Sequence, residues 1–205
     1  MSVHFTTYCA HMPETLARAF PGSLQQSLYA ALAGLPPTAY PPLGSITYSN
    51  SREWPQITVH GEPVVVPHRI YNAVPASVLS PDAQVGAAID CLYTRHNDGF
   101  VRQTALRRVL TAEHPWTVPF VLQLLGEYVI EICEDIQRFA EVQLATRPAW
   151  AREVRSFAGE NPDFIVLTRQ RATSYWECYY RGPHLYRDTY PGLRALDLML
   201  AGPVD

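Results

Sequence analysis

Apolar residues recur every three or four positions from residue 80 to the end of the chain, and no other feature limits the possible fold so strongly. This period puts apolar side chains on one face of an α-helix, and that face must be buried against another element. Proline, glycine and asparagine divide the region into successive helical segments. The sequence therefore predicts a mainly α fold, a helical body of stacked antiparallel helix pairs over residues 80–205.

The first predicted pair of helices meets in the segment TRHNDGFVRQ, residues 94–103. Ser80 can cap the first helix, with Pro81 at its first helical position. Asp98 can cap the second helix. We therefore expect this charged segment to be a turn between two helices, although its residue types would also suit the wall of an active site.

Further helical segments follow in the second half of the chain. A long apolar segment runs from Val118 to Leu144, and Gly126 is expected to divide it into two helices. Asn161 can cap the next helix, with Pro162 at its first position. The last apolar segment, YPGLRALDLML, predicts a short helix near the end of the chain.

The first part of the chain has a different character. Residues 1–34 predict two helices, of which the second can be capped by Ser23 and ended by Gly34. Residues 35–79 predict a loop with one β-hairpin at about 56–66, because apolar residues alternate around a His-Gly pair in QITVHGEPVVVP. An isolated hairpin is marginally stable, so we expect this one to lie on the helical body.

Composition bounds the class of protein. Hydrophobic residues make up 47% and charged residues 17% of the 205 residues, which predicts a single domain over residues 1–205. The formal net charge is −3, and a protein that binds nucleic acid through its phosphates needs a basic surface. A nucleic-acid partner is therefore not expected.

The chain contains no lysine, so all its basic residues apart from histidine are arginine. This excludes enzymes that form a Schiff base through lysine and those that bind phosphate through a P-loop or kinase lysine. A GC-rich genome would explain the same bias. No cofactor is expected.

Cysteine use and hydropathy indicate the compartment. The cysteines are isolated, with no CxxC pair, and stand at Cys9, Cys91, Cys133 and Cys178. This pattern favours a reducing cytoplasm over a disulfide scaffold. The N-terminus does not resemble a signal peptide, and no run of about 18 apolar residues could span a membrane.

Part of the chain resembles HEAT or armadillo-type helical repeats, in which the pattern D-x-x-V-R-x-x-A-L opens the inner helix. The pattern is matched by Asp98, Val101, Arg102, Ala105 and Leu106. A second unit, GEYVIEICEDIQRFA, departs from it, because Ile130 stands where the arginine belongs. The resemblance covers about residues 80–145 and implies a helical superhelix that binds other macromolecules.

Three glutamates, Glu127, Glu131 and Glu134, would lie on one line of a continuous helix. The helix around the first two is apolar on nearly every side, so these two carboxylates could be partly buried. They could form an acid/base pair or half of a dimetal site. We favour a structural role, in which they pair with arginines from other helices, and the candidates are Arg102, Arg107 and Arg171.

The segment RQRATSYWECYYR gathers arginine and aromatic side chains on about three helical turns. Its candidate binding residues are Arg169, Arg171, Tyr175, Trp176 and Tyr179. Such residues dominate protein interfaces and also stack on nucleic-acid bases. The alternative, which we favour, is a wide helix packed into the core with polar tips at its rim.

Metal sites and known catalytic motifs are not expected. His4, Cys9 and His11 are the one cluster of metal-ligand residue types, and we attribute their spacing to chance. The motifs HExxH, GxSxG and GxGxxG are absent.

These observations favour a cytoplasmic, non-enzymatic binding or scaffold protein whose partner is another protein, with self-association left open. The alternative is an enzyme that uses Glu127 and Glu131, with an arginine-lined pocket around Arg95, His96 and Arg102.

Overall fold

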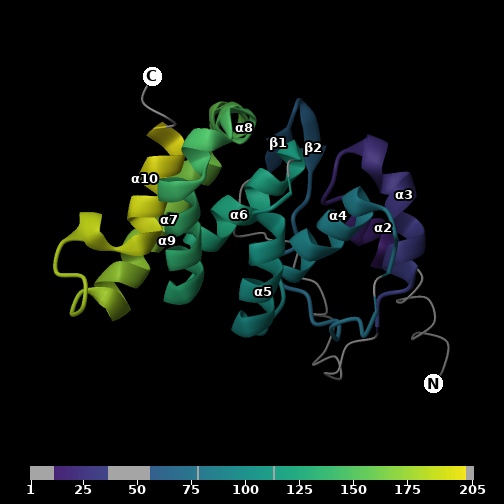
Figure 1. Ribbon diagram of the computed structural model, residues 1–205, viewed down its shortest axis with the longest axis horizontal. Coiled ribbons are helices and arrows are strands. Elements are labelled where there is room, and N and C mark those ends of the chain that lie inside the picture. Colours follow the sequence, from purple (N-terminus) through teal and green to yellow (C-terminus); the bar gives the residue numbers. More distant parts are fainter. Residues whose placement is uncertain (1–11, 37–55, 78, 113, 202–205) are drawn as a thin grey trace.

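The computed structural model describes residues 12–36, 56–77, 79–112 and 114–201 (Figure 1). The predicted mainly α fold with a small β-hairpin is confirmed. The α-helices are α2 (Met12–Ala17), α3 (Gly22–Ala33), α4 (Ala83–Tyr93), α5 (Gly99–Val109), α6 (Val118–Leu125), α7 (Ile130–Val142), α8 (Pro148–Glu160), α9 (Pro162–Tyr175) and α10 (Pro191–Ala201). The strands are β1 (Ile57–Val59) and β2 (Glu62–Val64), and short 3₁₀ turns follow at Pro115–Thr117, Leu144–Thr146 and Arg187–Thr189.

Helix α6 lies at the centre of the structure, and its sequence explains this position. Every residue of VPFVLQLL is buried, because a helix that is apolar on all sides is stable only when it is surrounded. Helices α7, α8, α9 and α10 pack around it. The predicted break at Gly126 is confirmed, since α6 ends there and α7 begins after a short loop, residues 126–129.

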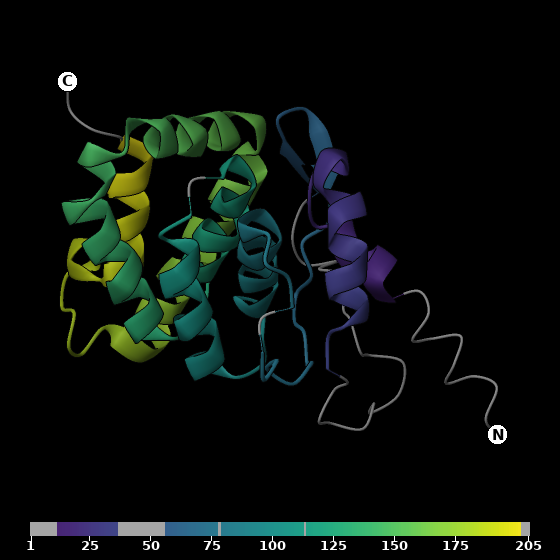
Figure 2. The ribbon, with the colours of Figure 1, turned by 45° about the vertical axis from the view of Figure 1, so that its right-hand side comes forward.

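Most helices pack against the helix that precedes or follows them in the sequence. Helix α2 packs on α3, α4 on α5 and α6 on α7, while the C-terminal helix α10 returns along α7. Figures 1 and 2 place α2 and α3 at one end of the molecule and α7, α9 and α10 at the other. Among the described residues, no helix has both the length and the apolar character needed to cross a membrane.

The predicted hairpin is also confirmed, with β1 antiparallel to β2 and Ile57 opposite Val64. Its turn has positive φ angles at both central residues, 52° at His60 and 78° at Gly61. This is the turn that matches the twist of a two-residue hairpin, and glycine adopts it without a Cβ clash. The apolar side chains of Ile57 and Val59 face the core, so the hairpin lies on the helical body as expected.

Asn161 joins the hairpin to the helices, and the prediction that it caps α9 is wrong. Its side-chain oxygen accepts a hydrogen bond from the Thr58 backbone N–H (2.7 Å), and its amide donates to the Thr58 carbonyl (2.8 Å). Its side chain makes no capping hydrogen bond to α9. The predicted start of this helix at Pro162 is nevertheless confirmed.

Two other predicted caps are also wrong. Helix α3 follows Pro21 without a side-chain cap, so Ser23 does not cap it. Helix α4 begins at Ala83, because the carboxylate of Asp82 accepts hydrogen bonds from the first free N–H groups of the helix. Ser80 instead accepts a hydrogen bond from the backbone N–H of Asp82 (3.1 Å), two residues too early to cap the helix.

Candidate functional site

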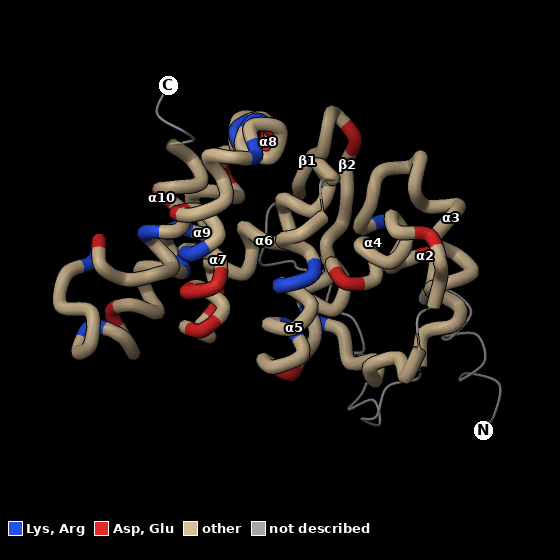
Figure 3. Tube along the Cα trace, in the orientation of Figure 1, with Lys and Arg blue, Asp and Glu red and all other residues tan. Residues whose placement is uncertain are grey.

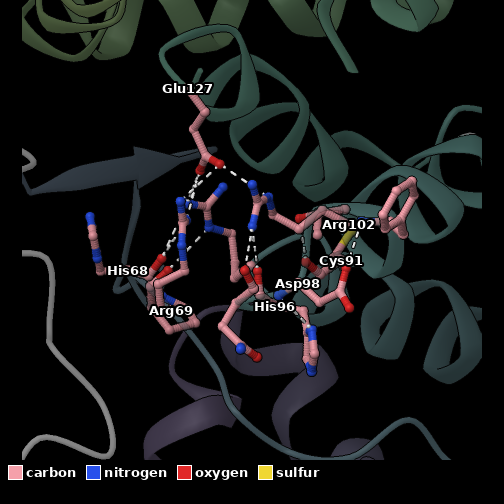
Figure 4. A network of polar contacts seen from close by, with 12 residues as sticks. His68, Arg69, Cys91, His96, Asp98, Arg102 and Glu127 are labelled. Atoms are coloured by element: carbon pink, nitrogen blue, oxygen red, sulfur yellow. Dashed lines mark hydrogen bonds and ion pairs between the residues drawn. The ribbon is translucent and has the colours of Figure 1, made fainter. Parts of the chain in front are cut away.

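A buried carboxylate joins three arginines between α4, α5 and α6 (Figure 4). Glu127 is only 5% exposed. Arg69 binds it in a bidentate manner, with Nη1–Oε1 2.8 Å and Nη2–Oε2 3.0 Å. Arg95 Nη2 lies 2.5 Å from Oε1, and Arg102 Nε lies 3.2 Å from Oε2. We call these four residues the ion-pair hub.

The hub cross-links four separate segments of the chain. Arg69 comes from the segment between β2 and α4, Arg95 follows α4, Arg102 lies on α5, and Glu127 lies in the loop 126–129. All three arginines also donate to backbone carbonyls, Arg69 to that of His68, Arg95 to those of Pro67 and His68, and Arg102 to those of His96 and Asn97. Each guanidinium therefore fixes both a side chain and a stretch of backbone.

The electrostatics of the hub keep its carboxylate ionised. Burial alone raises the pKa of Glu127, but the charges of Arg95 and Arg69 outweigh it and lower this pKa to about 2. Burial lowers the pKa of Arg95 to about 10, against the opposing charge of Glu127. A carboxylate with so low a pKa is a poor proton acceptor at neutral pH, so this geometry suits a structural role.

His96 lies beside the hub, and both of its ring nitrogens are engaged. Nε2 lies 3.0 Å from the Asn72 carbonyl oxygen, and Nδ1 accepts a hydrogen bond from the Asp98 backbone N–H (3.0 Å). The ring also stacks on Tyr93, with centroids 5.9 Å apart. No nitrogen is left to exchange a proton with a substrate, so this catalytic candidate has a structural geometry.

Asp98 confirms the turn predicted between the first two helices of the body. Its carboxylate accepts a hydrogen bond from the Phe100 backbone N–H (2.8 Å) and so caps α5. The charged segment at residues 94–103 is therefore the turn that joins α4 to α5, together with the start of α5. Its two arginines, Arg95 and Arg102, pair with Glu127 in the hub.

The structure separates the glutamates that the sequence placed on one line. Glu131 and Glu134 are exposed on α7, and the expected burial of Glu131 is wrong. The loop 126–129 breaks the helical phase, so Glu127 turns inward while the later glutamates face outward. Of the three arginines predicted as partners, Arg102 is confirmed and Arg107 instead pairs with Asp135 (Nε–Oδ2 2.9 Å). The third, Arg171, is not among the ion pairs of the hub.

A second cluster begins beside the hub, where the Tyr128 ring centroid lies 6.0 Å from the Arg102 guanidinium carbon. Its tyrosine rings lie against one another in series. The ring centroids are 6.1 Å apart for Tyr128–Tyr175, 6.2 Å for Tyr175–Tyr179, 6.5 Å for Tyr179–Tyr180 and 5.5 Å for Tyr180–Tyr190. We call these five residues the aromatic face. Tyr179 is 69% and Tyr128 is 51% exposed, whereas Tyr190 is buried beneath them.

A π-helical turn, Trp176–Tyr180, follows α9 and arranges the face. Single π turns of this kind are rare and occur often at functional sites. The Tyr180 hydroxyl donates to the Tyr128 carbonyl, and Trp176 Nε1 donates to the His184 carbonyl (2.8 Å). These bonds fix the rings to the backbone, while Tyr179 remains exposed.

The arginines predicted to belong to this surface have other positions. Arg169 pairs with Asp197 of α10 (Nη2–Oδ1 2.6 Å), and Arg171 is partly buried on α9. Arg181, which lies 5.8 Å from the ring centroid of Trp176, also pairs with Glu177. The structure therefore brings Tyr175 and Tyr179 together and adds Tyr128, which comes from a distant loop and was not predicted.

Unpaired carboxylates border the aromatic face. Within the described part of the chain, the carboxylates of Glu131 and Glu134 form no ion pair and accept no hydrogen bond, and Glu131 accepts one from Gln103 only at its backbone carbonyl. Both lie in the first half of α7, whose trace carries acidic positions in Figure 3. Burial raises the pKa of Tyr180, and the nearby charge of Glu131 raises it further, which links this carboxylate to the tyrosine rings.

The sequence reasoning also missed an apolar groove of about 710 Å³. Its walls include Val74 from the segment before α4, Ile89 and Tyr93 from α4, and Phe100 and Val101 from α5. Phe100 is 84% exposed. The sequence offered one indication, because Phe100 lies outside the apolar stripe of its helix.

Comparison of the chain with protein-family models, with curated proteins and with solved structures finds no match. The resemblance to HEAT or armadillo repeats therefore remains a prediction. The candidates His4, Cys9 and His11 lie outside the described residues. Elsewhere, over residues 12–36, 56–77, 79–112 and 114–201, histidine, cysteine and acidic side chains form no group of three that could hold a metal ion.

Proposed function

We propose that this chain is a non-enzymatic binding protein whose partner is another protein with a basic surface patch. The observation that carries the proposal is the aromatic face, in which the 69% exposed ring of Tyr179 stands on a fixed π-helical turn. Tyrosine offers a large contact area with little conformational entropy to lose, which is why it dominates interface hot spots. A series of tyrosine rings in which Tyr128 and Tyr179 are exposed is prepared for such a contact.

The charges beside the face favour a basic protein partner over nucleic acid. Glu131 and Glu134 have no ion-pair partner among the described residues, and the whole chain has a net charge of −3. Phosphates would be repelled by these carboxylates, whereas arginine or lysine side chains would pair with them and stack on the tyrosine rings.

The alternative of an enzyme receives less support from the geometry. Glu127 is held ionised by three arginines, and Glu131 is exposed on another element. His96 uses both ring nitrogens in backbone hydrogen bonds. We also infer a reducing, cytoplasmic location, because the thiols of Cys91 and Cys133 are buried and unpaired.

Affinity purification from the native host tests the proposal, with the wild-type chain and Tyr179→Ser as baits. Tyr29→Ser is the matched control, because Tyr29 is an exposed tyrosine on α3 at the other end of the molecule (38% exposed). The wild type and the control should retain the same basic protein, and Tyr179→Ser should lose it. Binding should also weaken as salt is raised.

Other outcomes would overturn the proposal. Equal retention by Tyr179→Ser would remove the aromatic face from the interface. Recovery of nucleic acid, with a steep salt dependence, would show that the partner is a nucleic acid and not a basic protein. A concentration-dependent dimer that Tyr179→Ser abolishes, seen by analytical ultracentrifugation, would replace the basic partner with a second copy of this chain.

A further inference from the structure

We infer that the aromatic face binds an arginine-rich segment of its partner, and that it selects arginine over lysine because the guanidinium plane stacks on the exposed ring of Tyr179. This inference rests on the proposed function and goes further, since a basic surface patch can be built from arginine or from lysine. The aromatic face thus recognises a residue type as well as a charge.

Two of the chain's own arginines already lie against rings at this surface. The guanidinium carbon of Arg102 is 6.0 Å from the ring centroid of Tyr128, the first ring of the series. That of Arg181 is 5.8 Å from the ring centroid of Trp176, the first residue of the π turn. A cation is attracted to the face of an aromatic ring within about 6 Å of its centroid. The rings of this surface therefore accept guanidinium groups from the chain itself.

Tyr179 offers a ring of the same kind to a partner. Among the described residues no arginine lies over this ring, and its ring neighbours are Tyr175 and Tyr180. The rings of Tyr175 and Tyr179 are inclined by only 28°, so they form a stack that another planar group can extend. Because Tyr179 is 69% exposed, a guanidinium from a second molecule can reach it.

The exposure of the Tyr179 ring favours arginine over lysine. A guanidinium is planar and weakly hydrated, so its flat face can contact a ring while its N–H groups stay in water. The ammonium group of lysine is compact and strongly hydrated, and it must give up bound water to make the same contact. An exposed ring provides little compensation for that loss.

Charge complementarity at the edge of the face points to the same occupant. The carboxylates of Glu131 and Glu134 have no ion-pair partner within the described part of the chain, whereas Glu177 of the π turn already pairs with Arg181. The charge of Glu131 contributes to the raised pKa of Tyr180, so this carboxylate acts on the rings themselves. A free carboxylate can accept two parallel hydrogen bonds from an arginine, a geometry that lysine does not offer.

Two synthetic peptides of equal charge test the inference, one that repeats arginine and serine and a copy with lysine at every arginine position. Isothermal titration calorimetry at low salt measures their affinity for the full chain. The wild type should bind the arginine peptide roughly tenfold more tightly than the lysine peptide. Tyr179→Ser should remove this preference, and Tyr179→Phe, which keeps the ring, should retain it.

Two outcomes would overturn the inference, and they have different consequences for the proposed function. Equal affinity for the two peptides, lost in Tyr179→Ser, would leave a face that binds basic partners without selecting arginine. Failure to bind either peptide, or a preference that persists in Tyr179→Ser, would also remove the aromatic face from the proposed interface.

Discussion

The ion-pair hub and the aromatic face use the same residue types in opposite ways. In the hub, Glu127 is 5% exposed and three arginines converge on its carboxylate. Around the face, Glu131 is exposed and has no ion-pair partner among the described residues, and the Tyr179 ring is 69% exposed. Burial thus decides which glutamates and tyrosines hold the fold together and which remain free to meet a partner.

The largest expected effect is in the hub, because a buried charge that loses its partner is costly. Glu127→Leu leaves three guanidiniums without their carboxylate and should lower the free energy of unfolding by about 3–5 kcal/mol. Urea denaturation measures this. Glu134→Leu, a change at an exposed glutamate beside the face, should lie within about 0.5 kcal/mol of the wild type. Equal losses in both variants would erase the distinction between the two regions.

Acid should weaken the hub. The pKa of Glu127 is lowered in the folded state, so its contribution is present above the ordinary value of 4.5 and is lost as the pH falls towards about 2. The loss should reach a few kcal/mol, and it should be smaller in Glu127→Gln, which has no carboxyl group at this position. Urea denaturation of both proteins at a series of acidic pH values measures this loss. If the free energy of unfolding fell equally with pH in both proteins, the ion pairing of Glu127 with the arginines would be contradicted.

The helix cap at Asp98 should have a moderate effect. Asp98→Ala removes the hydrogen bond to the Phe100 N–H and should cost about 1 kcal/mol, while Asp98→Asn should cost less. Thermal unfolding of the three proteins checks this order. Loss of partner binding in Asp98→Asn, at an unchanged melting temperature, would instead point to a functional role.

The smallest effect on stability is expected at the face. Tyr179→Ser removes a mostly exposed ring and should change the free energy of unfolding by no more than about 0.5 kcal/mol. Urea denaturation beside the binding assay is the check. A large loss would mean that Tyr179 is a structural residue and would weaken the proposed interface.

Local features of this molecule could be predicted from sequence, because short-range geometry determines them. The helical period, the break at Gly126, the hairpin turn at Gly61 and the Asp98 cap each depend on residues within a few positions. The predicted caps at Ser23 and Asn161 failed for different reasons. Helix α3 begins at Gly22, so Ser23 already lies inside the helix. The amide of Asn161 is instead engaged by a tertiary hydrogen bond with the backbone of Thr58.

The candidate sites required contacts that no local pattern contains. Arg69 and Arg95 lie 58 and 32 residues before Glu127 in the sequence, so their convergence depends on how the helices pack. Tyr128 meets Tyr180 across 52 residues in the same way. Glu131 was expected to be buried because a continuous helix was extended through Gly126, although a break was predicted there.

We infer that two glutamates four residues apart have opposite roles, and thermal unfolding of Glu127→Gln and Glu131→Gln at neutral pH distinguishes them. Glu127→Gln removes the charge that three buried or partly buried arginines share, so its melting temperature should fall by several degrees. Glu131→Gln should melt within about one degree of the wild type, because its carboxylate is exposed. An unchanged or higher melting temperature in Glu127→Gln would contradict the structural role of the hub and return this carboxylate to the candidates for catalysis.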